Sequence, residues 1–168
     1  MKEKECKSNE GKLYIAYGSN LNIGQMKYRC PTATVVHASE IKDYELVFRG
    51  SKTGSYATIE PCDGKTVPIL LWKTTAQDEL ALDFYEGYPN FYGKEDMEVD
   101  VDGQPVSAYV YIMPESHQLG MPTQRYIDCI LEGYDSAGFD PQILQDAIDD
   151  TEQKMDDLPQ AQLEMRWW

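Results

Sequence analysis

The amino-acid sequence predicts a single α+β domain in which strands precede two C-terminal helices. Three observations support this class: several short strand-like runs, an Asp-Gly hairpin signal, and two helical patterns in the last third of the chain. The chain has 168 residues, of which 42% are hydrophobic and 26% charged, as is ordinary for a soluble globular protein. A chain of this length can bury a core that folds without a covalent or metal staple.

The domain is expected to span residues 12–158. Residues 1–11 are charged and small without periodicity, so we expect a flexible N-terminal tail. Residues 159–168 are expected to form a C-terminal extension that ends in two tryptophans. The N-terminal sequence is too polar for a secretory signal, and no apolar run is long enough to span a membrane, so we expect a soluble, cytoplasmic protein.

The first predicted strand runs from Lys12 to Tyr17 and is apolar on both alternating faces, which indicates burial on two sides. Further strands are predicted at residues 44–48, 56–60 and 67–73. Residues 97–101 and 106–113 flank an Asp-Gly turn and predict a hairpin made of the last two strands. Alternation in residues 97–101 turns every second side chain inward: Met97, Val99 and Val101. The Asp-rich turn lacks the remaining ligands of a calcium loop, so the hairpin is the favoured interpretation.

A helix is predicted from Thr75 to Gly87, because Thr75 and Asp78 have the spacing of a capping box and glycine ends helices. Its apolar side chains fall on one helical stripe, the pattern of a helix with one apolar face: Leu80, Ala81, Phe84 and Tyr85. Two further helices are predicted at residues 123–134 and 141–155.

The formal net charge of −14, from 29 acidic and 15 basic residues, disfavours nucleic acid and anionic membranes as partners. Nine acidic residues but one basic residue, Lys154, lie within residues 132–157, and a solvated helix face explains them better than a functional patch. The four cysteines are scattered and only two histidines accompany them, so no zinc site is expected. Scattered thiols fit a reducing compartment.

The residues Tyr17, Gly18, Ser19 and Asn20 follow the first strand and precede a short predicted helix. A strand-to-helix corner leaves backbone N–H groups without partners, and glycine lets another group approach the backbone closely. Ser19 or Asn20 can cap the helix. Such a corner suits a carboxylate or an oxyanion, although a plain capped turn explains the same residues. Ser19 is not expected to be a nucleophile, because the G-x-S-x-G motif is absent.

Glu86 falls in the last turn of the predicted helix, before an aromatic loop. The partial negative charge at a helix C-terminus and desolvation by aromatic side chains both raise the pKa of a carboxyl group. A general base that works at neutral pH needs such a raised pKa. An ordinary surface glutamate is the alternative interpretation.

Other charged residues compete for roles in such a site. Asp83 and Glu95 are alternative candidates for the base, and Asp83 is close enough along the helix to share the environment of Glu86. Arg29, Arg49 and Arg125 are candidates to bind a substrate carboxylate, with a solvated surface position as the alternative for each.

Four stretches together resemble the gamma-glutamyl cyclotransferase-like family: "YGSNL" with its continuation at residues 17–31, "YATI" at residues 56–59, "LDFYEGYPNFY" at residues 82–92, and "TQRYIDCILEGY" at residues 123–134. The resemblance covers about residues 12–140 in the order of the family. It implies the gamma-glutamyl cyclotransferase-like fold, a small mixed β-barrel with flanking helices.

The resemblance also implies a site and a reaction. It makes Glu86 the catalytic residue and assigns substrate binding to one loop and two tyrosines: Tyr17, Gly18, Ser19, Asn20, Leu21, Tyr92 and Tyr126. It implies that a small γ-glutamyl amine or peptide is cyclised to 5-oxoproline without a metal or cofactor. The identity of the leaving group and the oligomeric state stay open, and a non-catalytic module that binds a small ligand in the same cavity is the alternative.

Overall fold

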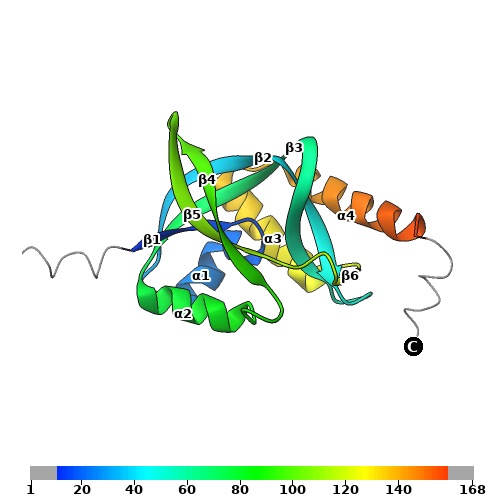
Figure 1. The fold of residues 1–168 in the computed structure, drawn as a ribbon, viewed down its shortest axis with the longest axis horizontal. Helices are drawn as coiled ribbons and strands as arrows, with labels where there is room; N and C mark the ends of the chain where they lie inside the picture. Colours follow the sequence, from blue (N-terminus) through cyan, green and yellow to red (C-terminus); the bar gives the residue numbers. More distant parts are fainter. Residues whose placement is uncertain (1–10, 159–168) are drawn as a thin grey trace, which may run out of the picture.

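The structure, a computed structural model, describes residues 11–158. The predicted C-terminal extension and, apart from Gly11, the predicted N-terminal tail lie outside these residues. The predicted α+β class is confirmed: six strands form one curled sheet, a half-barrel, and four α-helices pack around it (Figure 1). None of the helices within residues 11–158 is both long and apolar enough to cross a bilayer.

The sheet has the strand order β4-β5-β1-β3-β2-β6. The strands are β1 (Lys12–Ala16), β2 (Thr34–Gly50), β3 (Tyr56–Thr74), β4 (Gly93–Val101), β5 (Gln104–Ile112) and β6 (Gln118–Leu119). β1 pairs antiparallel with β3 and parallel with β5, so the sheet is mixed. Because β1 is an interior strand, its end is buried as the sequence predicts, and Ile15 and Ala16 have no exposed surface.

β2 and β3 form one long antiparallel ribbon, and here the sequence-based prediction was wrong. The strands predicted at residues 56–60 and 67–73 are a single strand, and β2 starts ahead of its predicted range. Within this ribbon the chain bends. The pairing shifts register between Lys42 and Tyr44, and Asp43 and Gly64 at the bend have φ of 63° and 85°. A bulge of this kind bends and twists a ribbon without ending it, which lets the sheet curl.

The predicted hairpin is confirmed. β4 and β5 pair so that Val101 lies opposite Gln104, which leaves Asp102 and Gly103 as the two turn residues. Both have positive φ, as a type I′ turn requires. β5 is not the last strand, however, because β6 follows and pairs with the end of β2. A strand of two residues is too short to give a periodic pattern.

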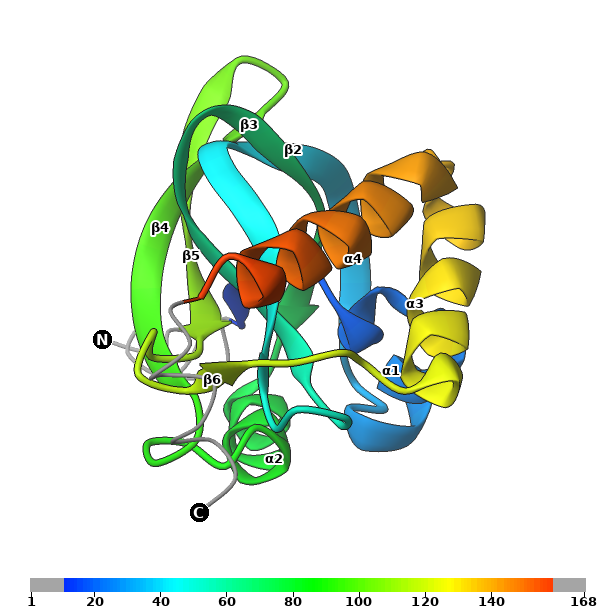
Figure 2. The ribbon, with the colours of Figure 1, turned by 90° about the vertical axis from the view of Figure 1, so that its right-hand side faces the viewer.

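The helices are α1 (Ile23–Arg29), α2 (Ala76–Tyr85), α3 (Gln124–Ala137) and α4 (Pro141–Asp156), and a 3-10 turn, η2 (Ser19–Leu21), precedes α1. The predicted capping box at Thr75 and Asp78 is confirmed, since both of its hydrogen bonds are present. In Figure 2, α4 lies across the β2–β3 ribbon and α2 lies below the sheet. The turn η2 contacts both α1 and α3.

The apolar stripe of α2 is not the face that packs on the core. Leu82 and Asp78 are buried, whereas Leu80 is 69% exposed and Phe84 is 91% exposed. A polar contact explains which face of α2 is buried. The buried Asp78 carboxylate accepts hydrogen bonds of 2.7 Å from the Thr32 hydroxyl, which holds this face of the helix against the chain before β2. Most of the apolar stripe therefore faces away from the core, and within it only Ala81 packs against the core.

Candidate active site

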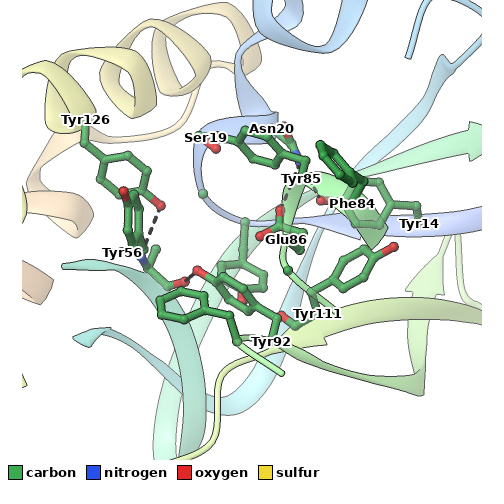
Figure 3. A pocket seen from close by; sticks show the side chains of 15 residues that line it. Tyr14, Ser19, Asn20, Tyr56, Phe84, Tyr85, Glu86, Tyr92, Tyr111 and Tyr126 are labelled. Atoms are coloured by element: carbon green, nitrogen blue, oxygen red, sulfur yellow. Dashed lines mark hydrogen bonds between the residues drawn. The ribbon is translucent and has the colours of Figure 1, made fainter. Parts of the chain in front are cut away.

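A cavity of about 370 Å³ lies where β1, β3 and the ends of α2 and α3 meet (Figure 3). Its lining is mostly aromatic: Tyr14, Tyr17, Gly18, Ser19, Asn20, Tyr56, Ala57, Phe84, Tyr85, Glu86, Gly87, Phe91, Tyr92, Tyr111 and Tyr126. Every site residue expected from the sequence lies in this list except Leu21. The structure thus brings the loop after β1, the end of α2 and the first turn of α3 to one place.

The end of α2 fixes the backbone at Glu86. Glu86 is the C-terminal cap of the helix, and Gly87 has a left-handed φ of 63°. The N–H groups of Gly87 and Tyr88 donate to the carbonyls of Phe84 and Asp83, at 3.2 Å and 2.9 Å. This pattern is a Schellman motif, which requires the left-handed residue that glycine adopts at low cost.

The Glu86 carboxyl points into the cavity toward Asn20 (Figure 3). The Asn20 side-chain N–H group lies 3.5 Å from Glu86 Oε1 and donates to Tyr14 Oη at 2.9 Å. Burial raises the pKa of Glu86 to about 7, and the positive charge of Arg29 opposes that rise. Both ionisation states of this carboxyl are populated near neutral pH, as a group that accepts and returns a proton needs.

Arg29 holds the polar groups around Glu86 in place without lining the cavity. Its guanidinium donates to Asn20 Oδ1 at 2.5 Å and to the Tyr85 hydroxyl at 2.6 Å. The same group lies over the Tyr85 ring, 3.6 Å from its centre. Because Asn20 Oδ1 faces Arg29, the amide N–H group of Asn20 faces Tyr14 and Glu86.

The competing carboxyl groups have other surroundings. Asp83 accepts hydrogen bonds from the Tyr111 hydroxyl at 2.6 Å and from Lys94 Nζ at 2.8 Å. It therefore orients a cavity tyrosine through its hydroxyl group. Glu95 is exposed on β4.

Two of the candidate arginines also lie away from the cavity. Arg49 pairs with Glu60 at 2.5 Å and donates to the carbonyls of Glu115 and His117. Arg125 is exposed in the first turn of α3 and is not a lining residue. Neither is placed to bind a carboxylate inside the cavity.

Gly18 lets the loop after β1 approach its neighbours closely. A Cβ atom at this position would lie 3.3 Å from both Ala57 Cβ and Tyr126 Oη. The expected cap of the following helix was wrong: Asn22 Oδ1 accepts the hydrogen bond from the Gln25 N–H at 3.1 Å. Ser19 and Asn20 do not cap this helix, and both line the cavity.

Leu21 belongs to the core. It has no exposed surface, and a Cβ atom on Gly133 of α3 would lie 2.6 Å from the Leu21 backbone carbonyl carbon. The missing side chain at Gly133 lets α3 press directly against η2. Leu21 thus anchors the loop beneath its polar residues, and nothing places it against a bound molecule.

Tyrosine hydroxyls tie the far wall of the cavity together. The Ala57 N–H donates to Tyr126 Oη at 3.0 Å, and the Tyr92 hydroxyl donates to the Ala57 carbonyl at 2.7 Å. Tyr126 and Tyr14 each accept a hydrogen bond, so each retains a hydroxyl proton to donate. Burial raises the pKa of both phenols well above the ordinary value, which keeps them protonated at neutral pH.

Sequence reasoning gave no place in the site to several lining residues: Tyr14, Tyr56, Ala57, Phe84, Gly87 and Tyr111. Tyr85 and Phe91 are among the aromatic residues that the sequence places around Glu86 as desolvating groups, and both line the cavity. Phe84 lies in the same aromatic run, which was the available signal for it. Tyr14 and Tyr111 come from the neighbouring strands β1 and β5, and only the pairing of those strands brings them together.

Comparisons with known proteins find one kind of relative in common, in a family model, among curated sequences and among solved structures. The family model described as "Gamma-glutamyl cyclotransferase, AIG2-like" matches residues 14–128, a region that contains every residue lining the cavity. Gamma-glutamylcyclotransferase of Mus musculus is 27% identical over 162 residues, which cover 88% of this chain and 85% of the mouse protein. The Homo sapiens protein of that name is 29% identical over 133 residues, covering 74% and 70%. A solved structure titled "Gamma-glutamyl cyclotransferase" superposes with a TM-score of 0.71 at 28% identity, covering 77% of this chain and 81% of its own.

Proposed function

Because the chain belongs to the gamma-glutamyl cyclotransferase, AIG2-like family, we propose that it is an enzyme that cyclises a γ-glutamyl amine or γ-glutamyl peptide to 5-oxoproline and releases a free amine or amino acid. One observation carries the proposal: a sheltered carboxyl group with a pKa of about 7, that of Glu86, faces the polar loop after β1. The proposed roles are general acid and base for Glu86 and substrate binding for the loop.

In the first step the Glu86 carboxylate takes a proton from the α-ammonium group of the substrate. This step is useful because an α-amino group has a pKa of about 8 and is mostly protonated at neutral pH. The neutral amine then attacks the γ-carbonyl carbon of the same molecule, and the new C–N bond closes a five-membered ring. Holding the glutamyl chain in the attacking geometry can supply about 7 to 11 kcal/mol.

The attack places negative charge on the γ-carbonyl oxygen. Two kinds of donor lie near that position in the cavity: the backbone N–H groups of the loop at Gly18 to Asn20, and the hydroxyl proton of Tyr126. Each well-placed donor to such an oxyanion is worth about 3 to 4 kcal/mol. The firm attachment of Tyr126 to the backbone of Ala57 keeps its hydroxyl from turning away.

In the last step the protonated Glu86 gives its proton to the leaving nitrogen as the original C–N bond breaks. The ring nitrogen still carries two hydrogens after the attack, and its second proton passes to the released amine. The products are 5-oxoproline and the protonated amine, no water is consumed, and Glu86 is again a carboxylate. One carboxyl group serves both proton transfers because its pKa lies near the working pH.

The substitution Glu86→Gln tests the proposal, with Glu95→Gln as the matched control on an exposed strand residue. Release of 5-oxoproline from a panel of γ-glutamyl compounds is expected to fall about 100-fold to 10,000-fold in Glu86→Gln and to be unchanged in the control. Full turnover by Glu86→Gln removes the acid–base role. A native protein that binds these compounds but releases no 5-oxoproline from any of them is a binding module.

A further inference from the structure

We propose that the leaving amine of the preferred substrate is neutral and apolar, with an aromatic ring preferred, and carries no carboxylate. This inference rests on the proposed function and concerns the cavity mouth, which we call the aromatic rim: Tyr56, Phe84, Tyr85 and Phe91. In this proposal the leaving amine contacts the rim, while Glu86 and the loop hold the glutamyl part.

Three of the four rim side chains are exposed although they are aromatic. Phe84 is 91% exposed, and Tyr56 and Tyr85 are 45% and 44% exposed. Phe84 is exposed because the polar anchor at Asp78 turns the other face of α2 inward. Covering apolar surface is worth about 25 cal/mol per Å², so an apolar leaving group gains binding free energy here.

Two rings of the rim, Tyr56 and Phe91, already belong to an aromatic cluster. Tyr56 meets Phe91 edge-to-face at 6.0 Å between centroids, and it meets Tyr126 in the same way at 5.3 Å. Edge-to-face arrangements present both ring faces and ring edges to a further ring. An aromatic amine therefore has partners on more than one side.

A leaving group with a carboxylate finds no opposite charge in this cavity. The lining residues include no lysine, arginine or histidine, and Glu86 is their single acidic residue. Two cations that contact lining residues are engaged: Arg29 with Asn20 and Tyr85, and Lys94 with Glu79 and Asp83. The α-carboxylate that all γ-glutamyl compounds share does not discriminate among them, so a second carboxylate adds desolvation cost without a partner.

A cationic leaving group is also disfavoured, because protein cations already lie over two aromatic rings, one in the rim and one beside the cavity. The Arg29 guanidinium lies 3.6 Å from the centre of the Tyr85 ring. Lys94 Nζ lies 4.5 Å from the centre of the Tyr88 ring, which contacts the cavity residue Tyr111. A second cation at either ring meets repulsion as well as attraction.

Four γ-glutamyl compounds separate these possibilities: the γ-glutamyl derivatives of phenethylamine, phenylalanine, 1,5-diaminopentane and ethylamine. The first two differ by one carboxylate, the third adds a positive charge, and the fourth lacks the ring. We expect kcat/KM for 5-oxoproline release to be at least tenfold higher for the phenethylamine compound than for the phenylalanine and diamine compounds. Equal or better use of either charged compound overturns the inference.

Variants of the rim test the same point. Phe84→Ala is expected to lower kcat/KM for the phenethylamine compound more than for the ethylamine compound. Leu80→Ala, an exposed apolar residue one turn away on α2 and outside the cavity lining, is the control and is expected to change neither. Phe84→Arg adds the missing cation and is expected to shift preference toward the phenylalanine compound, and an unshifted preference contradicts the charge argument.

Binding to the Glu86→Gln variant, measured by calorimetry with the intact compounds, separates this inference from the proposed function. The phenethylamine compound is expected to bind most tightly whether or not it is turned over. That order of affinities without turnover by the native protein overturns the proposed function alone. Turnover with the reverse order overturns the rim inference alone, and no binding of any compound overturns both.

Discussion

At the scale of single residues, the ionisation of Glu86 couples the site to folding. Burial moves the pKa of this carboxyl from 4.5 to about 7 in the folded protein. Below pH 4.5 the group is protonated in both states, and it has no effect on stability. Between these values the unfolded chain loses the proton while the folded chain keeps it, so stability falls as pH rises. Above pH 7 the loss is complete, and it amounts to at most about 3 kcal/mol.

The substitution Glu86→Gln removes that loss. We expect the variant to be more stable than the native protein at pH 8, by about 2 to 3 kcal/mol, and nearly equal at pH 4. Urea unfolding at the two pH values measures the difference. Glu95→Gln is the control for removing an exposed charge. A stability gain that is the same at both pH values means that the carboxyl is not destabilised by burial.

Arg29 is expected to set the pH range of the reaction. Its positive charge lowers the pKa of Glu86, so Arg29→Gln lets that pKa rise and moves the acidic limb of kcat/KM to higher pH. Arg29→Lys keeps the charge but not the paired hydrogen bonds to Asn20 and Tyr85, so it lowers kcat/KM with less movement of the limb.

A pH–rate profile of each variant makes this measurement, with Arg125→Gln as the control for loss of an arginine outside the cavity. If Arg29→Gln and Arg29→Lys give the same profile, charge is not what Arg29 contributes. A limb that moves equally in Arg125→Gln points to the overall charge of the protein instead.

At the scale of elements, the glycine that ends α2 links stability to catalysis. Gly87 and Gly138 both close helices with a left-handed φ, of 63° and 76°. A Cβ atom on Gly87 would lie 3.1 Å from Phe91 Cβ, whereas one on Gly138 meets nothing within 4 Å. An alanine would therefore have the same backbone strain at either position, but only at position 87 would its side chain also crowd a neighbour.

We expect Gly87→Ala and Gly138→Ala each to lose about 1 kcal/mol of stability or somewhat more, because alanine is strained at positive φ. Only Gly87→Ala is expected to reduce 5-oxoproline release strongly at a temperature where both variants are folded, because it displaces Glu86. Thermal unfolding and turnover measured side by side check this. Equal activity in the two variants shows that catalysis does not depend on the exact backbone conformation at the end of α2.

The same elements show how far the sequence alone leads. Capping at Thr75, the Asp-Gly hairpin and the helix end at Gly87 follow from local chemistry, and the structure confirms each. The sequence predicted two strands where β3 is one bent strand. A dipeptide such as Asp63-Gly64 is equally compatible with a turn between two strands and with a bend inside one strand. The inward face of α2 was misread because a buried carboxylate, Asp78, outweighs the apolar stripe, and its partner Thr32 is distant in the sequence.

The candidate site divides in the same way. The loop at Tyr17 to Asn20 and Glu86 are recognisable in the sequence because each is a continuous motif. Tyr14, Tyr56 and Tyr111 belong to strands, and only the registers of β1, β3 and β5 bring them to one cavity. Such registers depend on packing between distant segments, which periodicity does not report.

At the scale of the whole molecule, the net charge of −14 is expected to act on approaching substrates. The γ-glutamyl derivative of phenylalanine carries one net negative charge at neutral pH, and that of phenethylamine carries none. Raising the ionic strength from about 0.01 M to 0.15 M shortens the screening length from about 30 Å to about 8 Å. We expect kcat/KM to rise a few-fold for the anionic compound and to stay nearly constant for the other. An identical salt response for both rules out long-range repulsion.

The interior place of β1 also bears on how the protein is made. β1 is synthesised early, but its partners are β3, which ends at Thr74, and β5, which ends at Ile112. During translation the first strand stays unpaired and apolar until about 60 later residues have left the ribosome, and it has a partner on both sides only after about 100. Tyr126 follows later still, so the pocket is completed only after the scaffold around β1 has closed. Stalled or shortened chains are thus exposed to aggregation before they gain any ability to bind substrate.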